Sequence, residues 1–219
     1  MLALAGCRAS TRESPANAAA PERTQTDTPA SPPAHAKLPK VAFLGDSIAA
    51  GLHLAADQAF PAVLQTQLAA SGNAFELMNG GVSGDTTAGG LRRVDWLLKQ
   101  APKVVVIELG ANDGMRGVPV AEVEKNLRAI IAKVQAAGAT PLLLGMLIPP
   151  NYGPEYVNAF EAMYPRLAQE LHVAFVPSFM EGVAGVAALN LEDGIHPTPE
   201  GHVQLATKVA EPLRKLLTQ

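Results

Sequence analysis

The chain has 219 residues, of which 48% are hydrophobic and 17% are charged, and its formal net charge at pH 7 is −3. This length and composition predict a domain that is large enough to bury a sizeable core. The mild acidity argues against a nucleic-acid-binding surface. Beyond the N-terminal segment, no unbroken apolar run is long enough to span a bilayer.

The N-terminal segment differs in composition from the rest of the chain. Residues 8–37 are rich in Ala, Pro, Ser and Thr and hold almost no large apolar side chain, which predicts a disordered tether. A single cysteine, Cys7, excludes an internal disulfide framework. It follows Leu4-Ala5-Gly6, and this tetrad resembles the processing site of a bacterial lipoprotein, although six residues are too few for a whole signal peptide. We therefore interpret residues 1–7 as a truncated signal with a lipidation site, and expect an exported, periplasmic or membrane-anchored protein. An incidental thiol is the alternative.

Residues 38–219 are predicted to form the folded domain, because apolar runs alternate there with amphipathic segments. The expected strands lie at 41–44, 75–78, 104–107, 141–146 and 173–176, and the expected helices at 58–70, 87–99, 119–137, 155–171 and 199–217. The last helix begins at Thr198-Pro199, a typical N-cap and first-turn proline. This alternation predicts an α/β fold with a five-stranded parallel sheet covered by helices on both faces.

Polar residues follow three of the expected strands. Ser47 comes after the first strand in Gly45-Asp46-Ser47, Gly84 after the second, and Asn112 after the third in Gly110-Ala111-Asn112-Asp113. Right-handed crossovers bring the carboxyl ends of parallel strands to one edge, so we expect these residues on neighbouring loops. A fourth polar stretch, Asp193-Gly194-Ile195-His196, precedes the last helix.

These residue types match the needs of acyl transfer. The hydroxyl of Ser47 is a candidate nucleophile, and His196 is a candidate base because an imidazole titrates near neutral pH. Asp193 lies three residues earlier, and on a helical turn that offset would bring both side chains to one face, where Asp193 could orient His196. Gly84, Asn112 and the N–H of Ser47 are candidate donors to a developing oxyanion.

Together, the four stretches resemble the motifs of the GDSL or SGNH hydrolase family. Residues 106–117 and 148–153 extend the resemblance to its multifunctional thioesterase, arylesterase and lysophospholipase branch. The resemblance implies a three-layer α/β/α, flavodoxin-like fold without a cofactor. It also implies that Ser47 is the nucleophile, that Asp193 and His196 complete the triad, and that Gly84 and Asn112 are oxyanion donors.

The resemblance has two small departures and one implication for substrate binding. Ile48 stands where Leu is usual and Ala111 where this branch usually has Gly, but neither departure removes a reacting group. In this branch, the loops that carry Met115, Ile148 and Tyr152 line an acyl groove. Ordinary loop packing is the alternative interpretation of these three apolar side chains.

The sequence therefore predicts a serine esterase that cleaves acyl esters and thioesters, including acyl-CoA and lysophospholipids, through an acyl-enzyme. A carbohydrate acetyl esterase of the same fold stays open as an alternative. A metal-dependent hydrolase is disfavoured, since no Asp-x-Asp follows the first strand and no His-x-x-x-His occurs, so we predict no metal site. A non-catalytic binding module is disfavoured because every reacting side chain is present. The remaining polar candidates are predicted to be structural: Asp46, Asp85 and Asp113 cap or brace loops, and His53, His172 and His202 are solvated or locally satisfied.

Overall fold

The structure is a computed structural model that describes residues 37–219. Cys7, its lipoprotein-like tetrad and all but the last residue of the expected tether lie outside the described residues. The described part of the chain forms one compact unit, and all strands and helices below belong to it.

The centre of this unit is a five-stranded sheet with the order β2-β1-β3-β4-β5, and every neighbouring pair of strands is parallel. The strands are β1 (Lys40–Gly45), β2 (Glu76–Gly81), β3 (Val104–Glu108), β4 (Thr140–Leu144) and β5 (Ala174–Val176). The apolar runs of β1, β3 and β4 are buried on both faces, as parallel strands between helices require.

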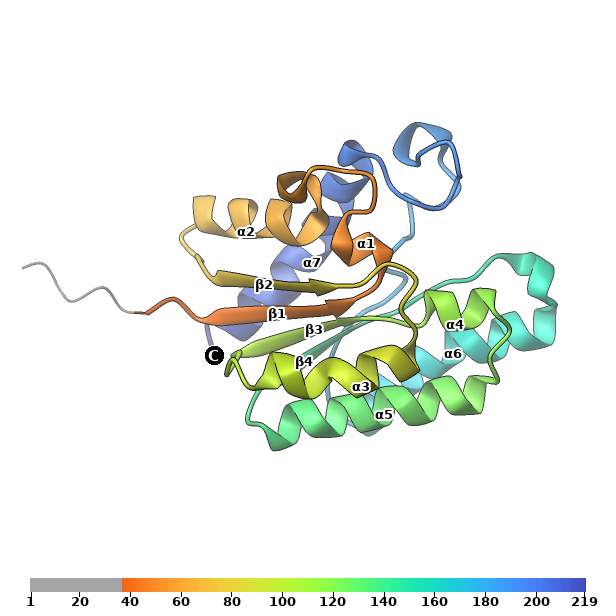
Figure 1. The fold of residues 1–219 in the computed structure, drawn as a ribbon, viewed down its shortest axis with the longest axis horizontal. Helices are drawn as coiled ribbons and strands as arrows, with labels where there is room; N and C mark the ends of the chain where they lie inside the picture. The colour runs from red at the N-terminus through yellow and green to blue at the C-terminus, as the bar shows by residue number, and fades with distance from the viewer. Residues whose placement is uncertain (1–36) are drawn as a thin grey trace, which may run out of the picture. The chain divides into compact units, whose positions relative to one another are not determined.

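Helices cover both faces of the sheet (Figure 1). On one face lie α1 (Ser47–Ala50), α2 (Phe60–Ala70) and α7 (Pro199–Leu217). On the other lie α3 (Thr87–Leu98), α5 (Val120–Ala136) and α6 (Pro154–Glu170), and the short α4 (Ala111–Met115) follows β3. The predicted α/β fold with three layers is thereby confirmed.

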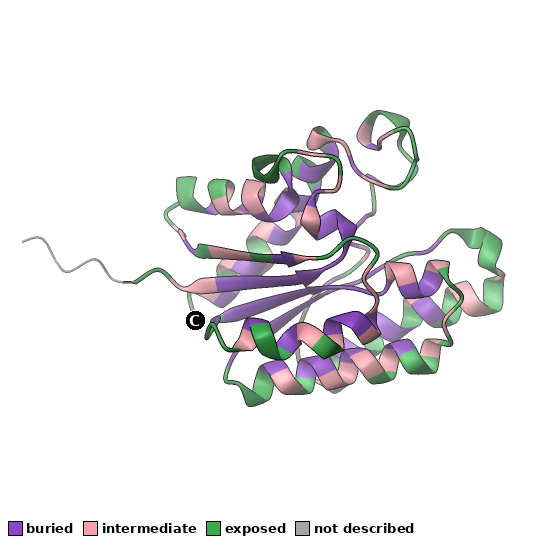
Figure 2. Ribbon diagram, in the orientation of Figure 1, coloured by how far each residue is buried: buried purple, intermediate pink, exposed green. Residues whose placement is uncertain are grey.

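The helices bury one stripe each and expose the opposite side (Figure 2). In α5 the buried positions recur at helical spacing: Val123, Leu127, Ile130, Ile131 and Val134. The green outer sides of α3 and α5 in Figure 2 face solvent, while the central strands β1, β3 and β4 are purple along most of their length and the edge strand β2 is mostly green and pink. In the part of the chain that the structure describes, no helix combines the length and the apolar character needed to cross a membrane.

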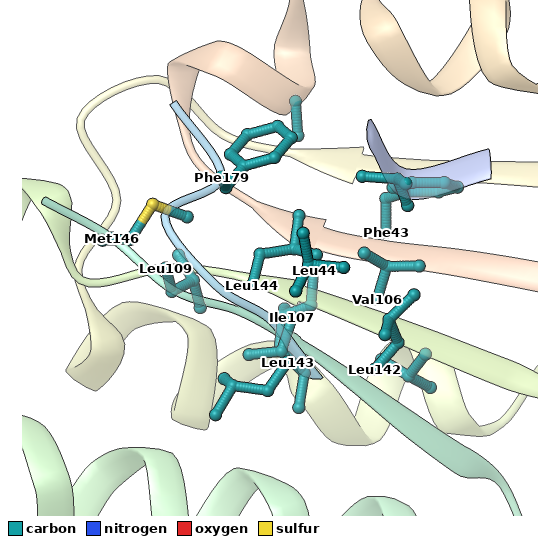
Figure 3. Packing of buried hydrophobic residues seen from close by; sticks show 14 of the residues in the cluster. Phe43, Leu44, Val106, Ile107, Leu109, Leu142, Leu143, Leu144, Met146 and Phe179 are labelled. Atoms are coloured by element: carbon teal, nitrogen blue, oxygen red, sulfur yellow. The ribbon is translucent and has the colours of Figure 1, made fainter. Parts of the chain in front are cut away.

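Packing across the sheet sets the strand register (Figure 3). Phe43, Val106 and Leu142 are partners across β1, β3 and β4. The ring of Phe43 meets Phe60 of α2 edge-on with centroids 5.6 Å apart, and Phe60 contacts Phe179 at 5.0 Å. Sliding one strand would move these side chains to the wrong face. The register therefore delivers the carboxyl ends of β1, β2 and β3 to one edge.

Strand boundaries shift by one residue in β1, β3 and β5 and depart further from the expectation in β2 and β4. Strand β2 begins one residue later and continues through Asn79-Gly80-Gly81, although glycine is a poor strand former. A Cβ at Gly81 would lie 2.3 Å from the backbone nitrogen of Ala50, so the close approach of α1 requires a glycine here. The Asn79 side chain also donates to the carbonyl of Ala49 at 2.7 Å. Strand β4 ends at Leu144, two residues before the expected end.

Candidate active site

Ser47 lies where β1 ends and is the first residue of α1. Asp46 caps this helix, because its Oδ1 accepts a hydrogen bond from the N–H of Ile48 at 3.0 Å. Gly51 ends the helix in the left-handed conformation with a φ of 68°. Within residues 37–219 the N–H of Ser47 donates to no protein acceptor. This turn therefore leaves both a hydroxyl and a free N–H at the sheet edge.

Ser47, His196 and Asp193 form one hydrogen-bonded chain. The Ser47 Oγ lies 2.9 Å from His196 Nε2, and His196 Nδ1 lies 2.6 Å from Asp193 Oδ2. A proton on Nδ1 that is donated to Asp193 leaves Nε2 free to accept from the Ser47 hydroxyl. The fold thus joins a residue after the first strand to a pair that lies about 150 positions later.

The segment that carries His196 and Asp193 is a turn rather than the helical turn we expected. Asp193 Oδ1 accepts from the N–H of Ile195 at 2.9 Å and from that of His196 at 3.0 Å, while Gly194 has a φ of 70°. These hydrogen bonds, the one from the His196 backbone foremost, hold the pKa of Asp193 well below its usual range. Asp193 is therefore ionised at neutral pH and can accept a hydrogen bond from the imidazole of His196.

Gly84 and Asn112 approach Ser47 from the ends of the neighbouring strands. Gly84 has a φ of 77°, and within the described range its N–H makes no hydrogen bond. Its carbonyl accepts from Arg116 Nη2 at 3.0 Å, which ties this loop to the end of α4. The Nδ2 of Asn112 donates to Asp46 Oδ2 at 3.1 Å, and this nitrogen carries a second hydrogen. Ser47, Gly84 and Asn112 thus each carry an N–H donor and line one pocket together.

A pocket of about 280 Å³ joins these groups. It is lined by Asp46, Ser47, Ile48, Leu52, Gly84, Ala111, Asn112, Met115, Ile195 and His196. Of the three side chains expected in an acyl groove, only Met115 lines it. Ile148 is 6% exposed and packs in the core behind Gly114, where a Cβ would lie 2.4 Å from its side chain. Tyr152 lines a separate depression with Tyr156, and its hydroxyl donates to the Met115 carbonyl at 2.7 Å.

Sequence reasoning missed Glu108, the last residue of β3. Its side chain is fully buried, and Oε2 accepts from the N–H groups of Asp46 and Ala49. The available signal was a lone acidic residue that directly follows the apolar run 104–107. Burial, with the Asp46 charge second, raises the pKa of Glu108 well above its usual value.

The other carboxylates brace loops, as the sequence indicated. Asp85 pairs with Arg93 at 2.7 Å, and Arg93 also donates to the carbonyls of Gly80 and Gly45 at the ends of β2 and β1. The buried Asp113 accepts from the backbone N–H of Thr87 at 2.8 Å and from its hydroxyl at 2.7 Å. These contacts connect the loop of Gly84, the start of α3 and the helix that bears Asn112.

The remaining histidines differ in environment. His202 is buried in the first turn of α7, and its Nδ1 accepts from the N–H of Phe60 at 3.0 Å. Burial lowers its pKa to about 4. Its partner is thus distant in sequence rather than local. His53 is exposed, and its ring meets His196 edge-on with centroids 6.2 Å apart, while His172 is exposed at the end of α6.

The acidic side chains at the edge are committed to N–H donors and to Arg93. Across residues 37–219, no three side chains of His, Cys, Asp or Glu converge as metal ligands would. The arrangement instead offers an oxygen nucleophile, an imidazole positioned by a carboxylate, and several N–H donors around one pocket. Such a set can transfer an acyl group from an ester or thioester to the hydroxyl and then to water.

The fold and these side chains define a hydrolase of the three-layer α/β/α class. The model of the GDSL-like lipase/acylhydrolase family matches residues 43–204. Esterase TesA of Pseudomonas aeruginosa is 45% identical over 175 residues, which cover 80% of this chain and 87% of the relative. Thioesterase 1/protease 1/lysophospholipase L1 of Escherichia coli K12 is 41% identical over 176 residues, with 80% and 83% covered.

A solved structure of high similarity is that of the psychrotrophic esterase EstA from Pseudoalteromonas sp., inhibited by monoethylphosphonate. Its TM-score is 0.77 at 35% identity, and the match covers 82% of this chain and 99% of the other. The present chain belongs to the GDSL-like lipase/acylhydrolase family. It is therefore an ester hydrolase.

Proposed function

We propose that the chain hydrolyses acyl esters and thioesters with Ser47 as nucleophile, His196 as general base and acid, and Asp193 as the carboxylate that orients the imidazole. The observation that carries the proposal is the continuous chain of hydrogen bonds, 2.9 Å from Ser47 to His196 and 2.6 Å from His196 to Asp193. This geometry is the one that makes a weak alcohol nucleophilic.

In the first half-reaction, Ser47 Oγ attacks the carbonyl carbon while its proton passes to His196 Nε2. The oxyanion of the tetrahedral intermediate accepts from the N–H groups of Ser47 and Gly84 and from Asn112 Nδ2. Asp193 stays ionised and stabilises the imidazolium. Collapse breaks the bond to the leaving alkoxide or thiolate, which takes the proton from His196.

In the second half-reaction, water attacks the acyl-enzyme. His196 Nε2 accepts a proton from this water, and the same three donors stabilise the second oxyanion. Collapse then returns the proton to Ser47 Oγ and releases the carboxylic acid. The enzyme is regenerated with all protons in their starting positions.

The pocket lining favours an acyl chain as the bound group. Leu52, Met115 and Ile195 give it apolar walls beside the nucleophile. The hydrogen bond from Tyr152 to Met115 places the Tyr152 depression next to this wall, so we assign Met115 and Tyr152 to acyl contact. We assign Ile148 to support of the wall from behind. Acyl-CoA and lysophospholipids are the larger substrates that we expect.

Replacing Ser47 tests the proposal directly. Ser47→Ala should abolish ester cleavage and labelling by a serine-directed phosphonate, with no loss of thermal stability. Ser83→Ala is the matched control, because Ser83 is an exposed serine at the same edge. Nitrophenyl esters from acetyl to long acyl chains, run beside acyl-CoA and lysophospholipid, define the substrate class. A sharp optimum at acetyl would favour the carbohydrate acetyl esterase instead, and undiminished turnover by Ser47→Ala would exclude the proposed nucleophile.

We further propose that the chain is exported and is tethered to a membrane through lipid on Cys7. The support is the tetrad that ends at Cys7 and the Ala/Pro/Ser/Thr-rich stretch that follows it. Mass spectrometry of the mature N-terminus should find a diacylglyceryl-modified Cys7, and Cys7→Ser should move the protein to the soluble fraction. An unmodified cysteine in the mature protein would remove the tether from the proposal.

A further inference from the structure

Glu108 holds both sides of the turn that presents Ser47. Its Oε2 accepts from the N–H of Asp46 at 3.0 Å, just before the nucleophile, and from that of Ala49 at 3.3 Å, just after it. A Cβ at position 45 would lie 2.5 Å from this oxygen, so the glycine there makes room for the carboxyl group. The turn is therefore built around a buried acid.

The second oxygen of Glu108 accepts no hydrogen bond from any of residues 37–219. Oε1 is buried and has no hydrogen-bond partner within the described part of the chain, while Oε2 holds the backbone of the neighbouring Asp46, whose carboxyl group acts on that of Glu108. The oxygens of Asp46 accept from Ile48 N–H and Asn112 Nδ2. Two adjacent ionised carboxylates would repel each other strongly in this interior, and a proton between them removes the repulsion and satisfies Oε1.

Arg93, the arginine that reaches this turn, does not relieve the repulsion between the carboxyl groups of Glu108 and Asp46, because it pairs with Asp85. The titratable groups from other elements that interact with the pair are His196 on its turn and Tyr164 of α6, and Tyr164 also feels the charge of Asp113 of α4. Arg93 reaches the carbonyl of Gly45 but forms its ion pair with Asp85. Burial raises the pKa of Asp46 to about 6 and that of Glu108 well above its usual value. Both oxygens of Asp46 accept N–H donors while Glu108 Oε1 accepts none within the described residues, so Glu108 is the member of the pair that keeps a proton.

We propose that Glu108 is a neutral carboxylic acid that donates its proton to the ionised Asp46, and that this pair positions two oxyanion donors. Asp46 then holds the amide of Asn112 by one hydrogen and leaves the other directed to the pocket. Glu108 sets the turn from which the Ser47 N–H projects. Both residues act through others, so they are positioning residues, and their role rests on the function proposed above.

Two isosteric substitutions distinguish this arrangement from ordinary core packing. Glu108→Gln keeps a neutral donor toward Asp46 and an acceptor toward the two N–H groups, so kcat should stay within about threefold of the parent value. Asp46→Asn replaces an acceptor with a donor beside Asn112, so kcat should fall by about 10- to 100-fold with KM nearly constant. Thermal unfolding of both variants separates misplaced donors from loss of fold, and Glu76→Gln, an exposed change on β2, is the control.

Infrared spectroscopy detects whether the carboxyl group of Glu108 is protonated, and it needs no substrate. The parent chain at neutral pH should show the carbonyl stretch of one protonated carboxylic acid, which Glu108→Gln should remove and Glu76→Gln should retain. Absence of this band, an equal loss of kcat in Glu108→Gln and Asp46→Asn, or parent-like turnover by Asp46→Asn would each overturn the inference. A parent chain that cleaves no ester would instead count against the proposed function, and the band would still decide the protonation of Glu108.

Discussion

The two sides of the candidate active site are built in opposite ways. The oxyanion side, which we define as Ser47, Gly84 and Asn112, is held by buried carboxyl groups that reach between elements distant in sequence. The imidazole side, residues 193–196, is an exposed turn held mainly by hydrogen bonds from Asp193 to its own neighbours.

This difference predicts that the two sides of the site contribute differently to the stability of the fold and to turnover. Changes on the oxyanion side disturb buried hydrogen bonds, so they should lower the free energy of unfolding together with turnover. Changes on the imidazole side touch groups that water can solvate in either state. They should therefore lower turnover alone, and the variants below test this separation from the largest expected effect to the smallest.

Asp193→Asn should produce the largest separation. The side-chain oxygen of Asn can keep both backbone hydrogen bonds of the turn, but its amide cannot accept from His196 Nδ1, so the imidazole takes the wrong tautomer. We expect kcat to fall by about 10⁴-fold. The melting temperature should stay nearly constant, because the Asp193 side chain is 40% exposed.

Glu192→Gln is the matched control for Asp193→Asn, since it removes one negative charge from the adjacent exposed position. Its kcat should equal that of the parent chain. A fall in both variants would mean that turnover depends on the net charge of the turn rather than on orientation of His196. A large loss of melting temperature in Asp193→Asn would break the proposed division between the two sides.

Asp113→Ala should show the opposite signature on the oxyanion side. It leaves the N–H and the hydroxyl of Thr87 without their buried acceptor. We expect the free energy of unfolding to fall by about 2–4 kcal/mol, and kcat to fall by about tenfold because Asn112 moves with its helix. Urea unfolding and steady-state kinetics measure the two effects.

Asp95→Ala provides the comparison for Asp113→Ala. Asp95 forms an exposed ion pair with Lys133, so its removal should cost less than about 1 kcal/mol and leave kcat unchanged. An Asp113→Ala variant as stable as Asp95→Ala would show that the buried carboxylate is not the element that holds this side together.

The convergence of the oxyanion side could be predicted from the sequence, because it follows from topology. Parallel strands end at one edge whatever their side chains, so the turns after β1, β2 and β3 bring Ser47, Gly84 and Asn112 together. The approach of Asp193 and His196 was expected for the wrong local reason. Two side chains three residues apart can meet in a helical turn or in a turn held by an Asp side chain, as Asp193 and His196 do. Sequence periodicity does not distinguish these two structures.

Contacts between distant segments set the limit of sequence reasoning. In the sequence, Glu108 looks like an ordinary strand end, and only the structure shows that it binds the turn around Ser47. Ile148 was expected in the groove, but in the structure it packs against Gly114, which leaves room for it. The extension of β2 through Gly81 likewise depends on how closely α1 approaches. None of these contacts leaves a periodic signal, because each depends on the space between two elements rather than on either one.

His202 tests whether a buried side chain close in sequence to the imidazole side affects stability. It lies six residues after His196 but, unlike residues 193–196, it is buried. Its pKa of about 4 in the folded chain is below the ordinary 6.5, so the unfolded chain binds more protons between these values. The free energy of unfolding should therefore fall as pH falls from about 6.5 to 4, by about 3 kcal/mol in total. His202→Asn, whose Oδ1 can accept from the N–H of Phe60, should remove this loss.

Comparing His202→Asn with the parent chain separates the effect of His202 on the pH dependence of stability from the effect of Asp46, which is the same in both chains. The raised pKa of Asp46, about 6, gives the opposite slope, since the folded chain binds the extra proton and its stability falls as pH rises from 3.8 to 6. Urea unfolding at several pH values should show a smaller acid loss in His202→Asn than in the parent, and no change in His172→Asn, an exposed control. Parallel curves of unfolding free energy against pH for all three chains would mean that folding does not lower the pKa of His202. The buried histidine would then respond to acid like an exposed one, and the separation between the two sides would rest on Asp113 and Asp193 alone.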